Sequence, residues 1–263
     1  MKAAFSPCPN DTFVFHALVH GLVPGAPPLD VTYADVDVTN TAALDGRYDL
    51  VKVSYAALPW LLDKYHLLPC GGALGRGCGP LVLTRGGTEF RTVAVPGDRT
   101  TAYLLFRLWA QGRGADIEVV PFHEIMPGVA DGRYDAGLVI HEARFTYPRY
   151  GLTALVDLGA WWESETGLPI PLGAILARRD AVDPTAATGW IRESVRYAWK
   201  HPEASRDYIL AHAQEMEPAV VAQHIDLYVN DFTDTLGEDG YAAAETLLDR
   251  AAAAGLVPQT GIR

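Results

Sequence analysis

The sequence predicts an α/β protein of two lobes, each a mainly parallel sheet flanked by helices. The first observation behind this prediction is an internal duplication. The residues Asp-Gly-Arg-Tyr-Asp occur at Asp45–Asp49 and again at Asp131–Asp135, each time followed by an apolar run. The second is that strand-like runs alternate with helix-spaced apolar residues ahead of both copies. The third is a tail from Pro184 onward in which helical spacing replaces this alternation.

The first half of the chain has the pattern of one βαβαβ unit, because short β-branched runs alternate with helical segments. Its predicted strands and helices, in chain order, are Lys2–Phe5, Asp11–His20, Leu29–Tyr33, Thr39–Asp45, Leu50–Ser54 and Tyr55–Tyr65. The glycine-rich stretch Gly71–Gly79 then ends the alternation and leads into a strand, Leu81–Thr84.

A second unit repeats this arrangement in the middle of the chain. Its predicted elements alternate strand and helix in the order Thr92–Val95, Thr101–Gln111, Ile117–Val120, Phe122–Ala130 and Ala136–Ile140. Units of this kind require parallel strands with helices on both faces of the sheet. Each copy of the repeated pentapeptide then marks a helix end, a glycine turn and the start of a buried strand.

Two further strand-like runs, Thr153–Leu158 and Ala174–Arg178, precede the helical tail. We therefore expect a discontinuous large lobe of residues 1–85 and 175–263, with a small lobe of residues 86–174 inserted between two crossing strands. This is the plan of a type II periplasmic-binding-protein-like fold. A single doubly wound sheet fits the same composition, and the duplicated unit favours two lobes.

Composition limits the classes of partner. The net charge is −11, and no cluster of Lys and Arg predicts a nucleic-acid partner. No basic amphipathic stretch and no apolar run of ~20 residues predicts membrane binding. The first residues run directly into a predicted strand without an apolar leader, so we expect a cytoplasmic protein. The three cysteines, Cys8, Cys70 and Cys78, lack metal-ligand spacing and are expected to be inert thiols. The oligomeric state is left open.

The duplication predicts where a ligand binds. The strand after the first copy ends at Ser54, and the strand after the second ends beside His141, at nearly the same distance from the repeat. Ligands of α/β sheets bind outside the carboxyl ends of strands, so the two residues are expected to face each other across a cleft. The imidazole of His141 suits proton abstraction near neutral pH, although an isolated histidine after a strand is often structural.

Further candidates surround these two strand ends. In Lys52–Val53–Ser54, the serine offers a hydroxyl and an N–H to a ligand, and the lysine offers a positive charge. No Gly-X-Ser-X-Gly surrounds Ser54, so it is not expected to be a nucleophile. Three other binding candidates, Asp11, Thr100 and Thr101, lie at helix starts after strands, where backbone N–H groups attract anions and where simple capping is the alternative.

Asn40 is a candidate to bind the ligand or to cap its helix. Nothing predicts a metal or an organic cofactor. His16 and His20 are four residues apart and could form a metal pair, but the His-Glu-X-X-His motif and a further nearby ligand are lacking, as are the glycine-rich loops that bind nucleotide phosphates. The expected partner is a small anionic molecule, held by local donors against the negative field of the whole protein.

Several blocks together carry a family resemblance, namely FSPCPNDTFVFHALVHG, KVSYAA, GGALGRG, IHEARFTYPRYGL, DLGAWWE and LPIPLGAILARR. They resemble the 1,4-dihydroxy-6-naphthoate synthases of the futalosine route to menaquinone. The resemblance implies an enzyme, a carbon–carbon lyase, that cleaves cyclic dehypoxanthinylfutalosine without a metal or cofactor. It also implies that His141 is the general base. A solute-binding protein of the same fold and the related chorismate dehydratase are the alternatives.

Overall fold

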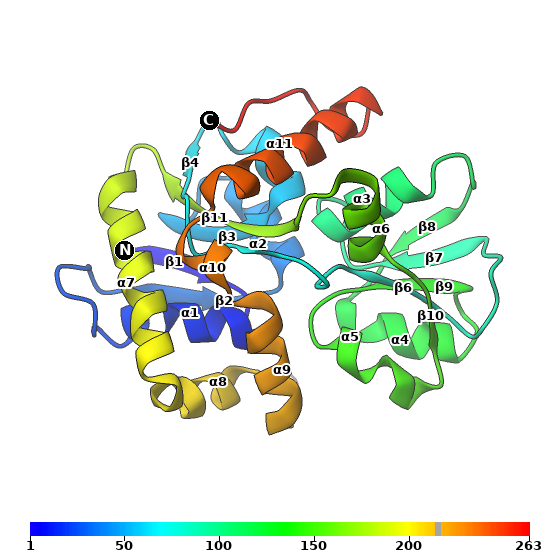
Figure 1. The fold of residues 1–263 in the computed structure, drawn as a ribbon, viewed down its shortest axis with the longest axis horizontal. Coiled ribbons are helices and arrows are strands. Elements are labelled where there is room, and N and C mark those ends of the chain that lie inside the picture. Colours follow the sequence, from blue (N-terminus) through cyan, green and yellow to red (C-terminus); the bar gives the residue numbers. More distant parts are fainter. Residues whose placement is uncertain (214–216) are drawn as a thin grey trace.

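The computed structural model describes residues 1–213 and 217–263 and shows two α/β lobes joined side by side (Figure 1). The larger lobe is built on a six-stranded sheet with the order β2-β1-β3-β11-β4, in which β5 also pairs with β11. The smaller lobe is built on a five-stranded sheet with the order β10-β6-β9-β7-β8. The predicted two-lobed α/β architecture is therefore confirmed.

The duplicated unit has the same topology in both lobes. In the larger lobe, β1 (Lys2–Phe5) lies between β2 (Asp30–Tyr33) and β3 (Leu50–Ser54), and both pairings are parallel. The equivalent strands of the smaller lobe are paired in the same way, in the order β8 (Asp116–Val119), β7 (Thr92–Val95) and β9 (Ala136–Val139). The sequence repeat thus corresponds to a repeated three-stranded arrangement.

The repeated pentapeptide has the same structural role in each lobe. Its glycines, Gly46 and Gly132, have positive φ just beyond helices α2 (Val36–Leu44) and α4 (Phe122–Ala130). Its last residue ties the start of one strand to the start of its neighbour. An Asp49 carboxylate oxygen accepts the backbone N–H of Lys2 at 2.8 Å, and an Asp135 oxygen accepts that of Thr92 at 3.1 Å.

These two aspartates also donate their own backbone N–H groups to the carbonyl oxygens of the same residues, at 2.9 Å for Asp49 to Lys2 and 3.1 Å for Asp135 to Thr92. The hydrogen bonds from Arg91 and Thr92 lower the pKa of the Asp135 carboxyl. Since Lys2 and Thr92 begin β1 and β7, both ties lie at the amino ends of the strands. The repeat therefore holds neighbouring strands together at their amino ends, away from the carboxyl ends where ligands bind.

The crossing segments add antiparallel strands to both sheets. β6 (Leu81–Thr84) and β10 (Thr153–Asp157) pair with each other in the smaller lobe, whereas β11 (Ile170–Arg178) pairs with β3 in the larger one. Each sheet is therefore mixed. The expected boundary after residue 85 is too late, because β6 belongs to the smaller sheet. The expected boundary after residue 174 cuts through β11, which pairs with β5 (Ala73–Gly75) from Ile170 onward.

One predicted helix is wrong. Residues Tyr55–Tyr65 form a short 3₁₀ helix over Tyr55–Trp60 and then the first residue of strand β4 (Tyr65–Leu67). Pro59 lies inside this segment, where its missing N–H and its ring oppose a longer α-helix. Strand β5, inside the glycine-rich stretch, was not predicted. The helices α1 (Pro9–Val19) and α3 (Thr101–Trp109) match their predictions within two residues at each end.

The helical tail returns to the larger lobe. Helices α7 (Pro184–Lys200), α8 (Arg206–His212) and α9 (Pro218–Tyr228) pack against α1, and α11 (Gly237–Ala253) packs on β11 (Figure 1). The remaining helical segments are α5 (Ala143–Thr146), α6 (Leu158–Thr166), α10 (Asp231–Asp234) and short 3₁₀ turns at Tyr147–Tyr150 and Pro202–Ser205.

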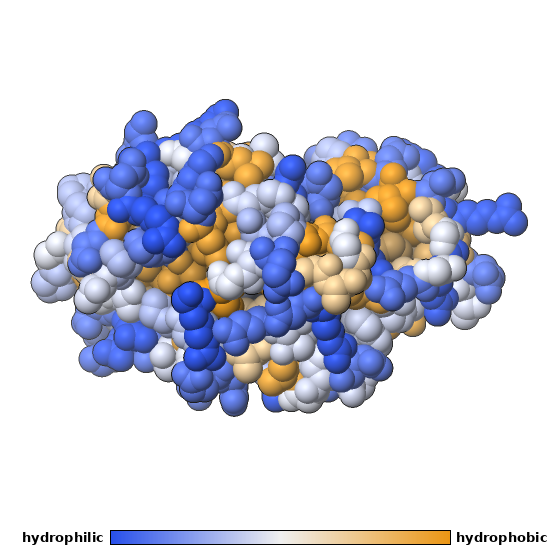
Figure 2. Space-filling model, turned by 90° about the horizontal axis from the view of Figure 1, so that it is seen from above, coloured by the Kyte–Doolittle hydropathy of each residue, from blue (hydrophilic) through white to orange (hydrophobic). Residues whose placement is uncertain are grey.

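Apolar residues fill the space between helices and sheets, and the face seen in Figure 2 is largely hydrophilic, with apolar areas between the polar side chains. Among the described residues, no helix is long and apolar enough to cross a membrane.

Two glycines set how closely the crossing segments approach each other. A Cβ atom on Gly79 would lie 2.1 Å from the backbone nitrogen of Gly159, an atom that no side-chain rotation can move. We predict that Gly79→Ala lowers the free energy of unfolding by about 1–3 kcal/mol through overpacking. Gly189→Ala is the matched control, because Gly189 is exposed within α7 and its Cβ would meet open space.

Gly189→Ala should instead stabilise the protein by about 0.5–1 kcal/mol, the usual gain for alanine in a helix. Urea denaturation of the three proteins gives both values. Equal stability of Gly79→Ala and the parent protein would show that the crossing segments separate without cost.

Candidate active site in the cleft between the lobes

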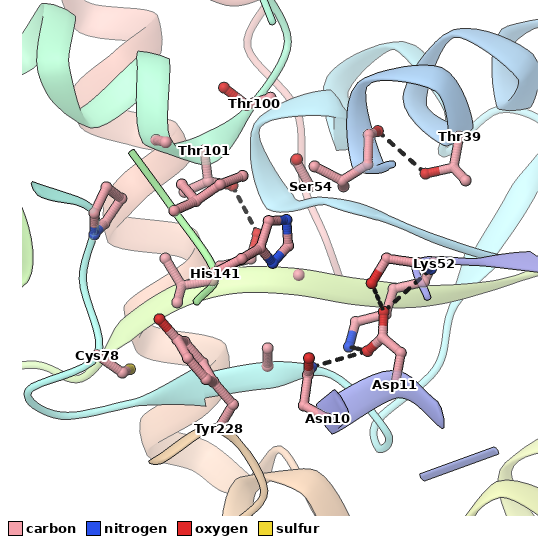
Figure 3. A pocket seen from close by; sticks show the side chains of 18 of the residues that line it. Asn10, Asp11, Thr39, Lys52, Ser54, Cys78, Thr100, Thr101, His141 and Tyr228 are labelled. Carbon is pink, nitrogen blue, oxygen red and sulfur yellow. Dashed lines mark hydrogen bonds and ion pairs between the residues drawn. The ribbon is translucent and has the colours of Figure 1, made fainter. Parts of the chain in front are cut away.

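A cleft with about 680 Å³ of empty space lies where the carboxyl ends of the duplicated strands meet. Both lobes line the cleft, and Figure 3 shows His141 near its centre. Of the sequence-predicted site residues, those that line it are Asp11, Lys52, Ser54, Thr100, Thr101 and His141.

Two predicted site residues do not line the cleft. Val53 is fully buried in the core, because successive side chains of a strand alternate and only Lys52 and Ser54 share the cleft-facing side of β3. Asn40 lies behind Ser54. Its Oδ1 accepts the Ser54 backbone N–H at 2.8 Å, and its Nδ2 donates to Ser54 Oγ at 3.1 Å. Asn40 therefore orients a lining residue without reaching the cavity.

The threonines at the start of α3 already have protein partners. The Thr100 hydroxyl caps the helix by accepting the Tyr103 N–H, and it donates to the carbonyl of Gly97. The Thr101 hydroxyl donates to the Leu172 carbonyl at 2.9 Å and accepts the Ala56 N–H at 3.2 Å. Thr101 therefore links α3 to the larger lobe. The start of a helix also favours a bound anion.

Lys52 does not present a free charge to the cleft. Its ammonium forms an ion pair with Asp11, and the side chains of both residues are almost fully buried, at 7% and 4% exposure. The other Asp11 oxygen accepts the Ser6 hydroxyl at 2.7 Å. The expectation that Lys52 offers its charge to a ligand is therefore replaced by a structural pairing that holds the first loop against β3.

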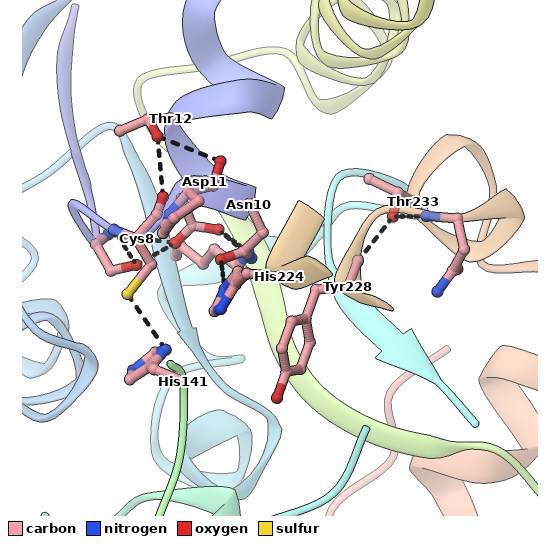
Figure 4. Close-up of polar contacts among 12 residues, drawn as sticks. Cys8, Asn10, Asp11, Thr12, His141, His224, Tyr228 and Thr233 are labelled. Carbon is pink, nitrogen blue, oxygen red and sulfur yellow. Dashed lines mark hydrogen bonds and ion pairs between the residues drawn. The ribbon is translucent and has the colours of Figure 1, made fainter. Parts of the chain in front are cut away.

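His141 has a backbone conformation that is unusual for its residue type. Its φ is +55°, the only positive value at a non-glycine position within residues 1–213 and 217–263. Such conformations are costly and often occur at functional sites. Its Nδ1 lies 3.3 Å from the Sγ of Cys8, and its Nε2 is buried without a hydrogen-bond partner among the described residues (Figure 4). The sequence duplication indicated His141 as a candidate, but it did not indicate that the thiol of Cys8 lies beside it.

Cys8, which the sequence predicts to be an inert thiol, lies beside His141. Burial, and then the charge of Glu142, raise the pKa of its thiol well above the ordinary value, so the group stays protonated. Its Sγ also lies 3.9 Å from a Glu142 carboxylate oxygen. The ligand atoms of Cys8, His141 and Glu142 all lie within 4.8 Å of one another, a grouping of metal-binding types that sequence spacing does not reveal.

Among the lining residues that sequence reasoning missed are His224 and Tyr228, which α9 brings from the helical tail. They are four residues apart and so share one helix face. The His224 ring lies 6.5 Å from that of His141 at an interplanar angle of 21°. Burial, and then the charges of His141 and Lys52, lower the pKa of His224 well below 6.5. In the sequence, the only signal was the four-residue spacing of His224 and Tyr228, which predicts a shared helix face. This spacing does not indicate that the face lines the cleft.

The ion pair generates a prediction about stability. Lys52→Met leaves the Asp11 carboxylate buried without its cation, and we expect a loss of about 3–5 kcal/mol in unfolding free energy. The double variant Lys52→Met, Asp11→Asn should recover part of this loss. Arg47→Met is the control, because the Arg47–Asp45 pair is exposed and should be worth less than about 1 kcal/mol. If denaturant titrations show an equally small loss of unfolding free energy for Lys52→Met and Arg47→Met, that result would contradict a buried, desolvated pair between Lys52 and Asp11.

Two α/β lobes around a ligand-sized cleft define the class of periplasmic-binding-protein-like proteins. The periplasmic aliphatic sulphonate binding protein SsuA of Escherichia coli has this fold, with a TM-score of 0.67 at 13% identity over all of this chain and 89% of that chain. Protein AF1704 of Archaeoglobus fulgidus is more similar. It has a TM-score of 0.92 at 32% identity, covering 97% of this chain and 98% of its own.

Within this class, a model of a menaquinone biosynthesis family matches residues 1–253. The 1,4-dihydroxy-6-naphthoate synthase of Streptomyces coelicolor is 64% identical, over 99% of this chain and 96% of its own length. The enzyme of the same name from Thermus thermophilus is 52% identical, over 97% of this chain and 95% of its own. The chain therefore belongs to this menaquinone biosynthesis family and is an enzyme.

Proposed function

We propose that this enzyme cleaves cyclic dehypoxanthinylfutalosine to 1,4-dihydroxy-6-naphthoate, with His141 as the general base. The observation that carries the proposal is the buried Nε2 of His141, which has no hydrogen-bond partner among the described residues, and His141 lines the cleft. The names of the two curated relatives support the product. The substrate and the role of His141 follow from the family resemblance together with this geometry.

The proposed base needs a defined proton arrangement. A neutral imidazole carries one N–H, and the contact of Nδ1 with Cys8 lets that N–H donate to the sulfur atom. Nε2 then keeps the lone pair that accepts a proton. Because the Cys8 thiol stays protonated, it takes no proton from His141 in the resting state. The imidazolium formed during the reaction lies beside the Glu142 carboxyl group, which favours its positive charge.

Proton abstraction next to a carbonyl places negative charge on oxygen. Donors that line the same cleft as the base include the Ser54 hydroxyl and the N-terminal turn of α3, which begins at Thr101. These groups are fixed before the substrate arrives, which is the arrangement that lowers the cost of developing charge. The same donors suit the carboxylate of an anionic substrate, which a protein of net charge −11 must bind through local groups. Formation of an aromatic product ring favours carbon–carbon cleavage.

Turnover of purified cyclic dehypoxanthinylfutalosine tests the proposed reaction. We expect formation of 1,4-dihydroxy-6-naphthoate without added metal, and no turnover of chorismate. Product chromatography with mass detection provides the measurement. Conversion of chorismate would instead assign the dehydratase activity, and binding of the first compound without product from either would indicate a solute-binding role.

The role of His141 is tested by His141→Asn, because asparagine tolerates positive φ better than most residues. We predict that kcat falls by ~10²–10⁴-fold while the thermal transition stays close to that of the parent protein. His123→Asn is the matched control, since His123 is an exposed histidine of the same lobe outside the cleft. Normal turnover by folded His141→Asn would remove His141 from the mechanism.

A further inference from the structure

We propose that His224 is the acceptor for a ligand hydroxyl group, held in one tautomer by a chain of hydrogen bonds from Lys52 through Asp11 and Asn10. This inference deepens the proposed function and rests on it in one respect: the hydroxyl belongs to the sugar-derived part of the proposed substrate. The chain of contacts itself lies within the described residues and is independent of which substrate binds.

The chain begins at the ion pair. An ionised carboxylate only accepts hydrogen bonds, and Asp11 is ionised beside the ammonium of Lys52. The side chain of Asn10 lies 2.9 Å from the same Asp11 oxygen, so it must present its NH₂ group there. The amide oxygen of Asn10 then faces the opposite way, toward α9 (Figure 4). The charge pair thereby fixes the orientation of an amide that would otherwise be free to flip.

The next contact fixes the tautomer of His224. Its Nε2 lies 2.9 Å from Oδ1 of Asn10. An amide oxygen carries no proton, so Nε2 must carry the hydrogen atom and donate it. Since a neutral imidazole has only one N–H, Nδ1 is left with a bare lone pair. The lowered pKa of His224 keeps the ring neutral at physiological pH, so Nδ1 stays an acceptor.

No described residue provides a partner for this acceptor. Within the described residues, Nδ1 of His224 is buried and has no hydrogen bond, and the residue as a whole is 1% exposed. Leaving such an atom unpaired costs about 1–3 kcal/mol, which a ligand donor can recover. His224 lines the cleft, so a bound molecule can reach it.

The chemistry of the acceptor selects the kind of ligand group. A carboxylate or a ketone carries no proton and would face a lone pair, whereas a hydroxyl group donates to it. The start of α3 has the opposite preference and favours an anion. The cleft therefore distinguishes two ends of one molecule, with an anionic group at α3 and a hydroxyl at α9. The 6.5 Å between the rings of His141 and His224 allows one small ligand to contact both.

A double-mutant cycle between protein and substrate tests the proposal. Cyclic dehypoxanthinylfutalosine and its monodeoxy analogues, each lacking one sugar-derived hydroxyl, are assayed with the parent enzyme and with His224→Phe, which keeps a ring but removes the acceptor. We expect His224→Phe to lower kcat/KM by ~10–100-fold on the full substrate. One analogue should suffer the same loss with the parent enzyme and no further loss with the variant.

The outcome that overturns the proposal is additivity, in which every analogue loses the same factor with both proteins. Calorimetric dissociation constants on the same compounds give the same test where turnover is absent. If the parent enzyme binds the compound but does not convert it, the proposed reaction fails while the coupling at His224 is still measured.

The tautomer is tested without any ligand. In nitrogen NMR spectra of protein with labelled histidine, the His224 signals are those lost in His224→Phe. We expect Nδ1 to be unprotonated and Nε2 protonated, unchanged as the pH is lowered from 8 through the ordinary histidine pKa near 6.5. Asn10→Leu should mix the two tautomers. A protonated Nδ1 in the parent protein would overturn the proposal.

Discussion

The buried ion pair between Lys52 and Asp11 is the interaction on which the cleft depends. Removing two charges from water costs several kcal/mol per ion, and attraction alone rarely offsets that cost. Here Asp11 also accepts from Ser6 and Asn10, and it lies in the first turn of α1, where the helix dipole favours a carboxylate. One residue from β3 and one from the first turn of α1 are thereby held together.

The Lys52–Asp11 ion pair has two consequences for the cleft. It neutralises a lysine that would otherwise attract any anion, so in the proposed function recognition of an anionic group falls to the donors at Ser54 and the start of α3. It also orients Asn10, which sets the proton arrangement of His224. On the other side of the cleft, the contact with Cys8 ties His141 to the first loop. Both imidazoles therefore contact residues at the start of α1, His141 through Cys8 just before the helix and His224 through Asn10 in its first turn.

The sequence predicted the parts of this arrangement that are local or repeated. Apolar runs predicted where strands end. Because equivalent strands end at equivalent places, the duplicated pentapeptide indicated that Ser54 and His141 occupy matching positions. Val53 was assigned wrongly because alternation along β3 was not applied. The places of Cys8 beside His141 and of His224 and Tyr228 in the cleft could not be predicted, since they depend on contacts between segments more than a hundred residues apart. Their chemistry is visible in the sequence, but their proximity is a property of the folded chain.

The carboxylates of Asp49 and Asp135 have the same anchoring role in both halves of the duplicated arrangement. Each ties the first strand of its unit to the third at the end remote from the cleft, and each sits in an identical pentapeptide. At the opposite end, one half carries a serine and the other a histidine. Rigidity and reactivity thus occupy different ends of the same strands. Such a division lets a protein designer exchange the groups at the cleft while leaving the anchoring of both sheets untouched.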